Sequence, residues 1–177
     1  VSLNLTTAQE VEAAVEKAKE HGRSVLVEQM IEGFDHRMLV VDGELIAVSK
    51  RVPGHVIGDG KSSISELVDR VNEDPRRGVG HEKVLTRIEL DYQANRLLEG
   101  AGYTAETILD KGEVFYLRST GNLSTGGTAI DLTDVVHPDN KEMAQRAARA
   151  IGLDVAGVDF ITPDITRSYR EIGGAIC

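Results

Sequence analysis

Apolar residues recur at helical spacing in four stretches of the chain. The first stretch follows Thr7, which forms a capping box with Glu10, and it ends at Gly22. A second capping box at residue 63 begins the next predicted helix, which Pro75 breaks. The same spacing predicts two more helices, at residues 88–98 and 139–151.

Runs of β-branched and apolar residues predict strands between these helices. They lie at residues 24–29, 37–41, 44–49, 114–117, 156–161 and 171–177. Asp42-Gly43 joins two of these runs and is a strong hairpin signal, and we expect the last two strands to pair with each other. Hairpins among interspersed helices favour an α+β fold with mixed or antiparallel sheets over a doubly wound parallel sheet.

The composition is that of a globular protein. The 177 residues are 41% hydrophobic and 28% charged, and no apolar run approaches the roughly 20 residues that span a bilayer. The formal net charge of −9 argues against a nucleic-acid partner, because such partners are bound mainly through Lys and Arg. The single cysteine, Cys177, excludes an internal disulfide and fits a reducing cytoplasm, where we expect the protein. The lack of a long apolar run and of a signal-like N-terminal segment argues against a membrane partner.

Three common catalytic patterns are missing from the sequence. Gly60-Lys61-Ser62 does not complete a P-loop, because His55 stands where that motif needs its first glycine. The five histidines lack a zinc-binding spacing, and no serine lies in a G-x-S-x-G turn. The chemistry of the chain must therefore be sought in other clusters.

Polar residues interrupt apolar or glycine-rich sequence in three clusters. In residues 27–37, charged residues follow a strand and a glycine turn, for which a solvated loop is the alternative. Residues 117–127 place an arginine, an asparagine and hydroxyls on a glycine-rich loop that either presents N–H groups to phosphate or is only flexible. Asp159 stands inside an apolar strand, where a carboxylate is costly unless it is paired, holds Mg²⁺ or faces solvent.

These three clusters, in this order, resemble the ATP-grasp family of ligases. Such enzymes hold ATP between two α+β lobes, phosphorylate a carboxylate and let an amine attack the acyl phosphate. The resemblance implies the C-terminal part of the ATP-grasp fold, with ATP and Mg²⁺ as cofactors. It places Asp35 at the ribose hydroxyls and Asp159 on the metal, and it assigns the adenine site to Glu28, Gln29 and Ile31.

Longer strings are similar to one group of this family, the cyanophycin synthetases. They lie at residues 51–61, 74–78, 122–134, 156–160 and 173–177. The resemblance implies a ligase that adds aspartate to the poly-aspartate backbone of a cyanophycin primer and that forms a homo-oligomer. Bifunctional glutathione synthetases share a related N-x-S-T-G-G loop. A glutathione-type or D-alanine-type amide ligase is therefore an alternative, and a non-catalytic nucleotide-binding module is another.

Departures from the family pattern predict an incomplete domain. The family's glycine-rich phosphate loop would lie just before Val1, and its Glu-x-Asn metal element just after Cys177. We therefore expect residues 1–177 to be a partial ATP-grasp domain that is inactive alone, with residues 51–90 as an inserted loop and helix. Gly157 stands where some of these ligases carry a phosphate-binding arginine, and the resemblance offers Arg118 for that role.

Phosphoryl transfer needs cations that neutralise developing charge, and an arginine fork can bind phosphate or carboxylate through two hydrogen bonds. The resemblance therefore assigns catalysis to Arg118 and Arg37. It assigns phosphate or substrate binding to Arg51, Asn122, Ser124, Gly126 and Gly127. The catalytic base stays open among His36, His55 and His81.

Overall fold

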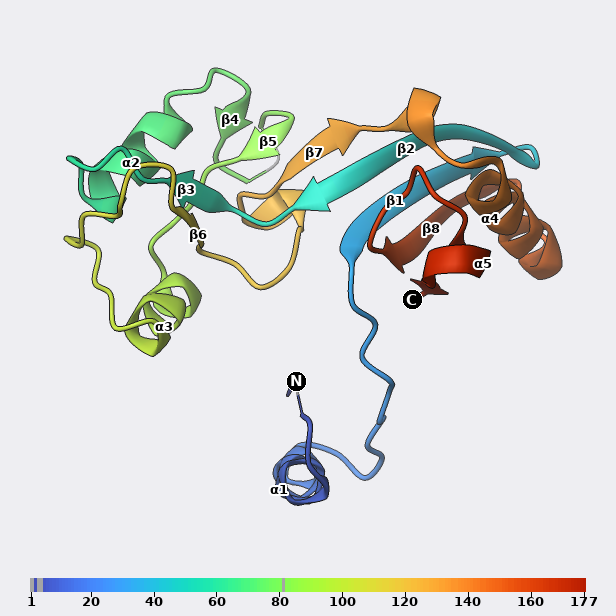
Figure 1. The fold of residues 1–177 in the computed structure, drawn as a ribbon, viewed down its shortest axis with the longest axis horizontal. Coiled ribbons are helices and arrows are strands. Elements are labelled where there is room, and N and C mark those ends of the chain that lie inside the picture. The colour runs from blue at the N-terminus through green and yellow to red at the C-terminus, as the bar shows by residue number, and fades with distance from the viewer. Residues whose placement is uncertain (1, 3–4, 81) are drawn as a thin grey trace. The chain divides into compact units, whose positions relative to one another are not determined.

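The computed structural model describes residue 2 and residues 5–80 and 82–177. The chain divides into two compact units, Val1–Glu32 and Gly33–Cys177. Figure 1 draws the elements of both units. None of the described helices has the length and apolarity needed to cross a membrane.

In the first unit, the helix α1 (Ala8–Lys19) begins as the sequence predicts. The Thr7 hydroxyl accepts a hydrogen bond from the Glu10 N–H, and the Glu10 carboxylate accepts one from the Thr7 N–H. The strand predicted at residues 24–29 is wrong. This stretch has no partner strand in the described part of the unit, and its side chains Leu26 and Val27 stay exposed, Leu26 to 79%.

A five-stranded antiparallel sheet forms the centre of the second unit, in the order β7-β2-β1-β8-β9. Its strands are β1 (Phe34–Val41), β2 (Glu44–Val52), β7 (Thr128–Asp131), β8 (Val155–Thr162) and β9 (Ala175–Ile176). Asp42 (φ 50°) and Gly43 (φ 77°) join β1 to β2 in the tight hairpin turn that the sequence predicts. This sheet with its flanking helices confirms the α+β prediction.

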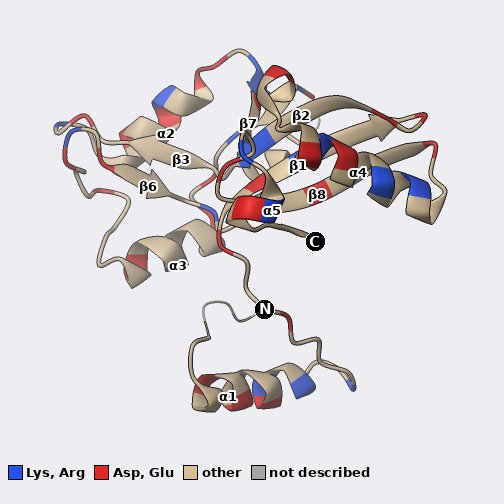
Figure 2. Cartoon of the chain, turned by 45° about the vertical axis from the view of Figure 1, so that its right-hand side comes forward, with Lys and Arg blue, Asp and Glu red and all other residues tan. Residues whose placement is uncertain are grey.

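The helix α4 (Pro138–Ile151) covers one face of this sheet and closes its hydrophobic core (Figure 1). Alternate strand residues such as Met38 and Val158 point into that core. His137 caps α4 and Gly152 ends it, so the helix predicted at residues 139–151 is confirmed. Figure 2 shows acidic residues near the start of α4 and basic residues toward its end, as the helix dipole favours.

The strand predicted at residues 171–177 forms only in part. The short helix α5 (Tyr169–Ile172) takes the first residues, because the Ser168 hydroxyl caps it by accepting from the Arg170 N–H. The pairing with the preceding strand is confirmed for β9, whose two residues lie opposite Phe160 and Ile161 of β8.

A second hydrophobic core lies in the segment between β2 and β7. Its elements are β3 (His55–Ile57), α2 (Ile64–Asn72), β4 (Arg77–Gly78), β5 (Leu85–Thr86), α3 (Tyr92–Gly100) and β6 (Val114–Tyr116). β3 pairs with β6, and β4 with β5. The helix predicted from residue 88 begins only at Tyr92, because the Asp91 carboxylate accepts from the Ala94 N–H and so caps α3. Two 3₁₀ turns, η1 (Leu123–Thr125) and η2 (Thr133–Val135), flank β7.

Candidate functional site

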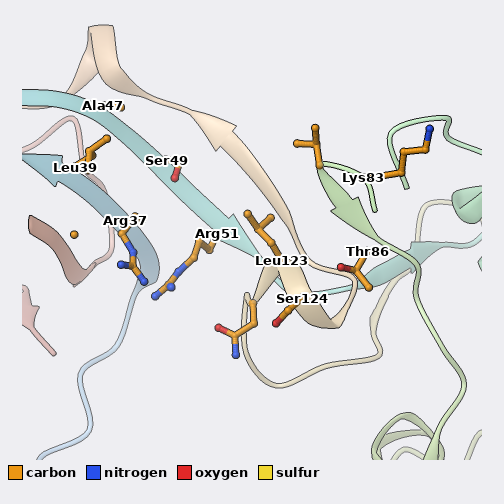
Figure 3. Close-up of a pocket in the computed structure, with 12 residues that line it drawn as sticks. Arg37, Leu39, Ala47, Ser49, Arg51, Lys83, Thr86, Leu123 and Ser124 are labelled. Carbon is orange, nitrogen blue, oxygen red and sulfur yellow. The ribbon is translucent and has the colours of Figure 1, made fainter. Parts of the chain in front are cut away.

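A cavity of about 760 Å³ lies on the face of the five-stranded sheet that points away from the α4 core (Figure 3). Strand alternation places Arg37 and Leu39 in this cavity, while Met38 between them is buried in the core. The sheet also contributes Ser49, Arg51 and Gly157. The other walls come from β5 and its preceding loop, with Lys83 and Thr86, and from the η1 loop, with Asn122 and Ser124.

All the described charged side chains that line this cavity are cationic, among apolar residues such as Leu39 and Leu123. Arg37, Arg51 and Lys83 line it, and no carboxylate from the described residues does. Asn122 and Ser124 add an amide and a hydroxyl, which are further hydrogen-bond donors. A concave site with three cations and these donors is suited to a polyanion such as a chain of phosphates.

Two carboxylates at the edge of the cavity hold its arginines. Asp159 lies opposite Arg37 in the β1–β8 register, and the Arg37 Nε atom is 2.8 Å from its Oδ1. The Arg51 Nη2 atom is 2.7 Å from Asp35 Oδ1 and 3.1 Å from Asp159 Oδ1. Burial lowers the pKa of the Arg51 guanidinium, but the hydrogen bond to Asp35 and the charges of both carboxylates outweigh it and raise the pKa overall. Arg51 therefore stays charged.

The glycines of the η1 loop shape the wall of the cavity. The Gly126 N–H donates to the Leu123 carbonyl (3.3 Å), and the Gly127 N–H donates to the Asn122 carbonyl (3.1 Å). These two amides are thus used inside the loop, and Asn122 and Ser124 are the loop's polar side chains in the cavity. Gly126 has a φ of 93°, and a Cβ there would lie 2.8 Å from Ile88 Cγ1, so the loop fits closely against the segment after β5.

Arg77 lies behind this wall and joins its two parts. Arg77 is only 8% exposed, and its Nη1 atom donates to the carbonyls of Thr86 (2.6 Å) and Gly126 (3.0 Å). Sequence reasoning missed Arg77, Lys83 and Thr86 as part of the site. The Arg76-Arg77 pair is visible in the sequence as a basic cluster, but only the fold shows which of the two is buried.

The structure brings Arg37, Arg51, Asn122 and Ser124 together, with Asp35 and Asp159 beside them. It does not bring Arg118 to this cavity. That side chain is buried and donates to the carbonyls of Leu117 and Glu89 and to Asp91. Its part in catalysis stays a prediction.

The residues assigned to adenine lie in the first unit. Glu28 and Gln29 are exposed there and Ile31 is half-buried. Glu28 lines a cavity of about 570 Å³ within that unit, formed with α1.

None of the described candidate bases lines the cationic cavity. His36 is 1% exposed and alternates with Arg37 along β1, so it points to the opposite face of the sheet. The His55 Nδ1 atom lies 2.9 Å from the Pro53 carbonyl oxygen. His81 lies outside the described residues.

The described residues contain no group of three or more His, Cys, Asp or Glu side chains that could hold a metal ion. Asp159 is 32% exposed at the edge of the cationic cavity. Mg²⁺ commonly binds one or two protein carboxylates together with the phosphates of a substrate, and this single carboxylate fits that mode.

Comparisons with known proteins identify the fold and the relatives of this chain. A scan against models of protein families finds no match. The chain is 53% identical over 176 residues to a cyanophycin synthetase of Trichormus variabilis and 51% identical over 178 residues to one of Crocosphaera subtropica. Among solved structures it resembles a bifunctional glutathione synthetase from Pasteurella multocida, with a TM-score of 0.71 and 35% identity over 93% of this chain and 22% of that one. This chain is part of an ATP-grasp fold and a homologue of the cyanophycin synthetases.

The ATP-grasp relatives are much longer than this chain. The matches to the two cyanophycin synthetases cover 99% of the chain but 20% of each relative. A glutathione biosynthesis bifunctional protein of Clostridium perfringens is 37% identical over 163 residues, 92% of this chain and 21% of that protein. Both groups that the sequence motifs suggest are therefore among its relatives, and the cyanophycin synthetases have the higher identity.

Proposed function

We propose that this chain is the phosphate-handling part of an ATP-dependent ligase that joins a carboxylate to an amine through an acyl phosphate. The cationic cavity is the observation that carries the proposal. It gathers Arg37, Arg51 and Lys83 on one concave surface of an ATP-grasp fold. Phosphoryl transfer develops negative charge on the transferred group, and catalysis depends largely on cations placed in advance around it.

The residues of the cavity have distinct tasks in this proposal. Arg37 and Arg51 bind phosphate oxygens or the substrate carboxylate through their planar forks. Asn122 and Ser124 donate from the opposite wall and orient the bound group. Asp159 and Asp35 hold the arginines between substrates. Mg²⁺ held by Asp159 and the phosphates would neutralise further negative charge.

The substrate that we propose is the growing end of a poly-aspartate chain, with aspartate as the incoming amine and a cyanophycin primer as acceptor. Identities of 51–53% to cyanophycin synthetases support this assignment. A glutathione-type ligase is the second candidate, and the solved structure of a bifunctional glutathione synthetase supports it at 35% identity. A homo-oligomeric state is part of the proposal and needs its own measurement.

Phosphate release tests the proposed reaction in the protein that carries this segment. The assay supplies ATP and Mg²⁺ with a β-aspartyl-arginine primer and one amino acid at a time. Release that requires both primer and aspartate is the expected result. Release that requires glycine and γ-glutamyl-cysteine would instead select the glutathione-type reaction, and no release under any combination would reject the ligase proposal.

A cavity variant and a surface variant connect the assay to the site. Arg51→Ala removes a guanidinium that lines the cavity, and we expect kcat to fall about a hundredfold. Arg76→Ala removes an exposed arginine that pairs with Asp74 and does not line the cavity, and it is expected to leave kcat unchanged. Equal rates for both variants would exclude the cavity from the reaction.

A further inference from the structure

Gly157 of β8 lies beneath the side chain of Arg37. A Cβ atom built on Gly157 would lie 2.4 Å from Arg37 Nη1, 3.2 Å from its Cδ and 3.4 Å from its Cζ. The guanidinium therefore occupies the space that any side chain at residue 157 would need. Both residues line the cationic cavity.

The strand register explains why these two residues meet. Gly157 is paired with Leu39 and Asp159 is paired with Arg37, so Arg37 and Gly157 are diagonal neighbours on one face of the sheet. Long side chains reach a diagonal neighbour, and Arg37 leans across β8 to do so. At the same time its Nε atom stays 2.8 Å from Asp159 Oδ1. The space above Gly157 and the ion pair with Asp159 thus together place the guanidinium over β8.

We infer that Gly157 is a positioning residue of the cavity, which sets where the Arg37 guanidinium meets a bound phosphate group. The inference rests on the proposed function, because it names what places one of that site's cations. It also identifies residue 157 as a position where size determines affinity for the anion. A methyl group there pushes Nη1 away from β8 and separates Arg37 from Asp159.

A positioning role and an ordinary structural role predict opposite effects of Gly157→Ala on thermal stability. Gly157 is not among the residues with positive φ, so alanine fits the backbone of the strand. Glycine weakens a strand interior relative to other residues. The atom in the way of the methyl group is the far end of a flexible side chain. Gly157→Ala is therefore expected to keep or raise the thermal stability while it weakens anion binding.

Calorimetric titration of the 177-residue chain with inorganic triphosphate tests the inference. We expect Gly157→Ala to raise the Kd about tenfold, as the loss of one charge-assisted hydrogen bond would. Gly100→Ala is the control, because it adds the same methyl group at an exposed position of α3 where no other segment of the chain lies within 4 Å, and its Kd should be unchanged. The melting temperature of each variant is measured in parallel.

A double-mutant cycle shows whether Gly157 acts through Arg37. In an Arg37→Ala background, Gly157→Ala should cause no further loss of affinity. Three results would overturn the inference without affecting the proposed phosphate site. They are an equal loss of affinity from Gly157→Ala in both backgrounds, an unchanged Kd in the single variant, and a melting temperature that falls together with the affinity. Absence of triphosphate binding by the unmodified chain would overturn the phosphate site, and this inference with it.

Discussion

The Arg118 guanidinium lies 2.9 Å from the Asp91 carboxylate, Nη2 to Oδ2, although the arginine side chain is only 4% exposed. Asp91 also caps α3 through its other oxygen, and Arg118 donates further hydrogen bonds to the carbonyls of Leu117 and Glu89. One buried cation therefore joins the start of a helix to the chain that follows β6. These contacts are structural, whereas the family resemblance suggests a catalytic task for the same residue.

We predict that Arg118→Met lowers the free energy of unfolding by about 2 kcal/mol, because it leaves two carbonyls and the capping carboxylate without their donor. Urea unfolding of the 177-residue chain measures this loss. Arg76→Met is the matched control, since Arg76 also pairs with a nearby aspartate but is largely exposed, and its effect should be smaller. Unchanged stability in Arg118→Met would show that these contacts contribute nothing and would favour the catalytic interpretation.

Local sequence patterns predict those parts of the fold that depend on local contacts. The capping boxes at Thr7 and Ser63, and the Asp42-Gly43 turn, form as the patterns indicate. The strand predicted at residues 24–29 fails because a strand needs a partner, which its own sequence does not contain. The start of α3 differs from the prediction for another reason. The apolar residues from position 88 suggest an earlier start, but Asp91 caps the helix, which therefore begins at Tyr92.

We predict that Arg77→Met loosens the wall of the cavity as well as the fold. Burial lowers the pKa of Arg77, which still donates to the carbonyls of Thr86 and Gly126. Losing both bonds should cost about 2 kcal/mol of unfolding free energy. Hydrogen exchange at the Gly127 amide should then speed up more than exchange at Val40 in the sheet core. Arg77→Lys keeps the charge and should show a smaller effect; equal acceleration at both amides would mean that Arg77 stabilises the fold only globally.

The candidate site was only partly predictable, because its residues come from distant parts of the sequence. Arg37, Arg51 and Asp159 attract notice as charges in or beside apolar strands, and the register then brings them together. Lys83 carries no such signal, because it lies in the loop between β4 and β5. The pairing of these two strands, which the sequence does not reveal, brings that loop to the cavity. The Gly157 contact depends on a diagonal reach across two strands that no spacing along one strand encodes.

The stability of the chain should fall as the pH drops below neutrality, because of His36. Burial, the largest cause, and the Lys50 charge lower the pKa of this imidazole, while the backbone of Phe34 and Phe160 and the Asp35 charge oppose the shift. The unfolded chain takes up the proton near the ordinary pKa of about 6.5, whereas the folded chain takes it up only at lower pH. The contribution of His36 is therefore complete above pH 6.5 and is lost as the pH falls toward the folded-state pKa.

Unfolding by urea between pH 7.5 and pH 5 measures this dependence, and the NMR titration of the His36 ring gives its pKa directly. His36→Gln removes the titrating group, so its stability should change less over the same range. His55→Gln is the control variant, which should keep the pH dependence of the unmodified chain. A His36 ring that titrates at or above pH 6.5 in the folded chain would contradict the prediction.

Asp159 has two candidate roles, as the ion-pair partner that holds the arginines and as a ligand for Mg²⁺, and substitution by asparagine distinguishes them. It pairs with both Arg37 and Arg51, so it competes with any anion that enters the cavity. In the absence of Mg²⁺, Asp159→Asn should bind inorganic triphosphate about fivefold more tightly, because one negative charge beside the site is removed.

In the presence of Mg²⁺ the Asp159→Asn variant should lose the gain in affinity that the metal gives to the unmodified chain, because an amide is a weaker ligand than a carboxylate. Asp164→Asn is the control variant, because Asp164 does not line the cavity and its carboxylate accepts a hydrogen bond from the Thr166 hydroxyl, so its affinity should be unchanged. Calorimetric titrations with and without Mg²⁺ measure both effects. Tighter binding that keeps the full gain from Mg²⁺ would leave Asp159 as an arginine anchor and remove it from the metal site, whereas unchanged binding without Mg²⁺ would show that the two ion pairs do not compete with the anion.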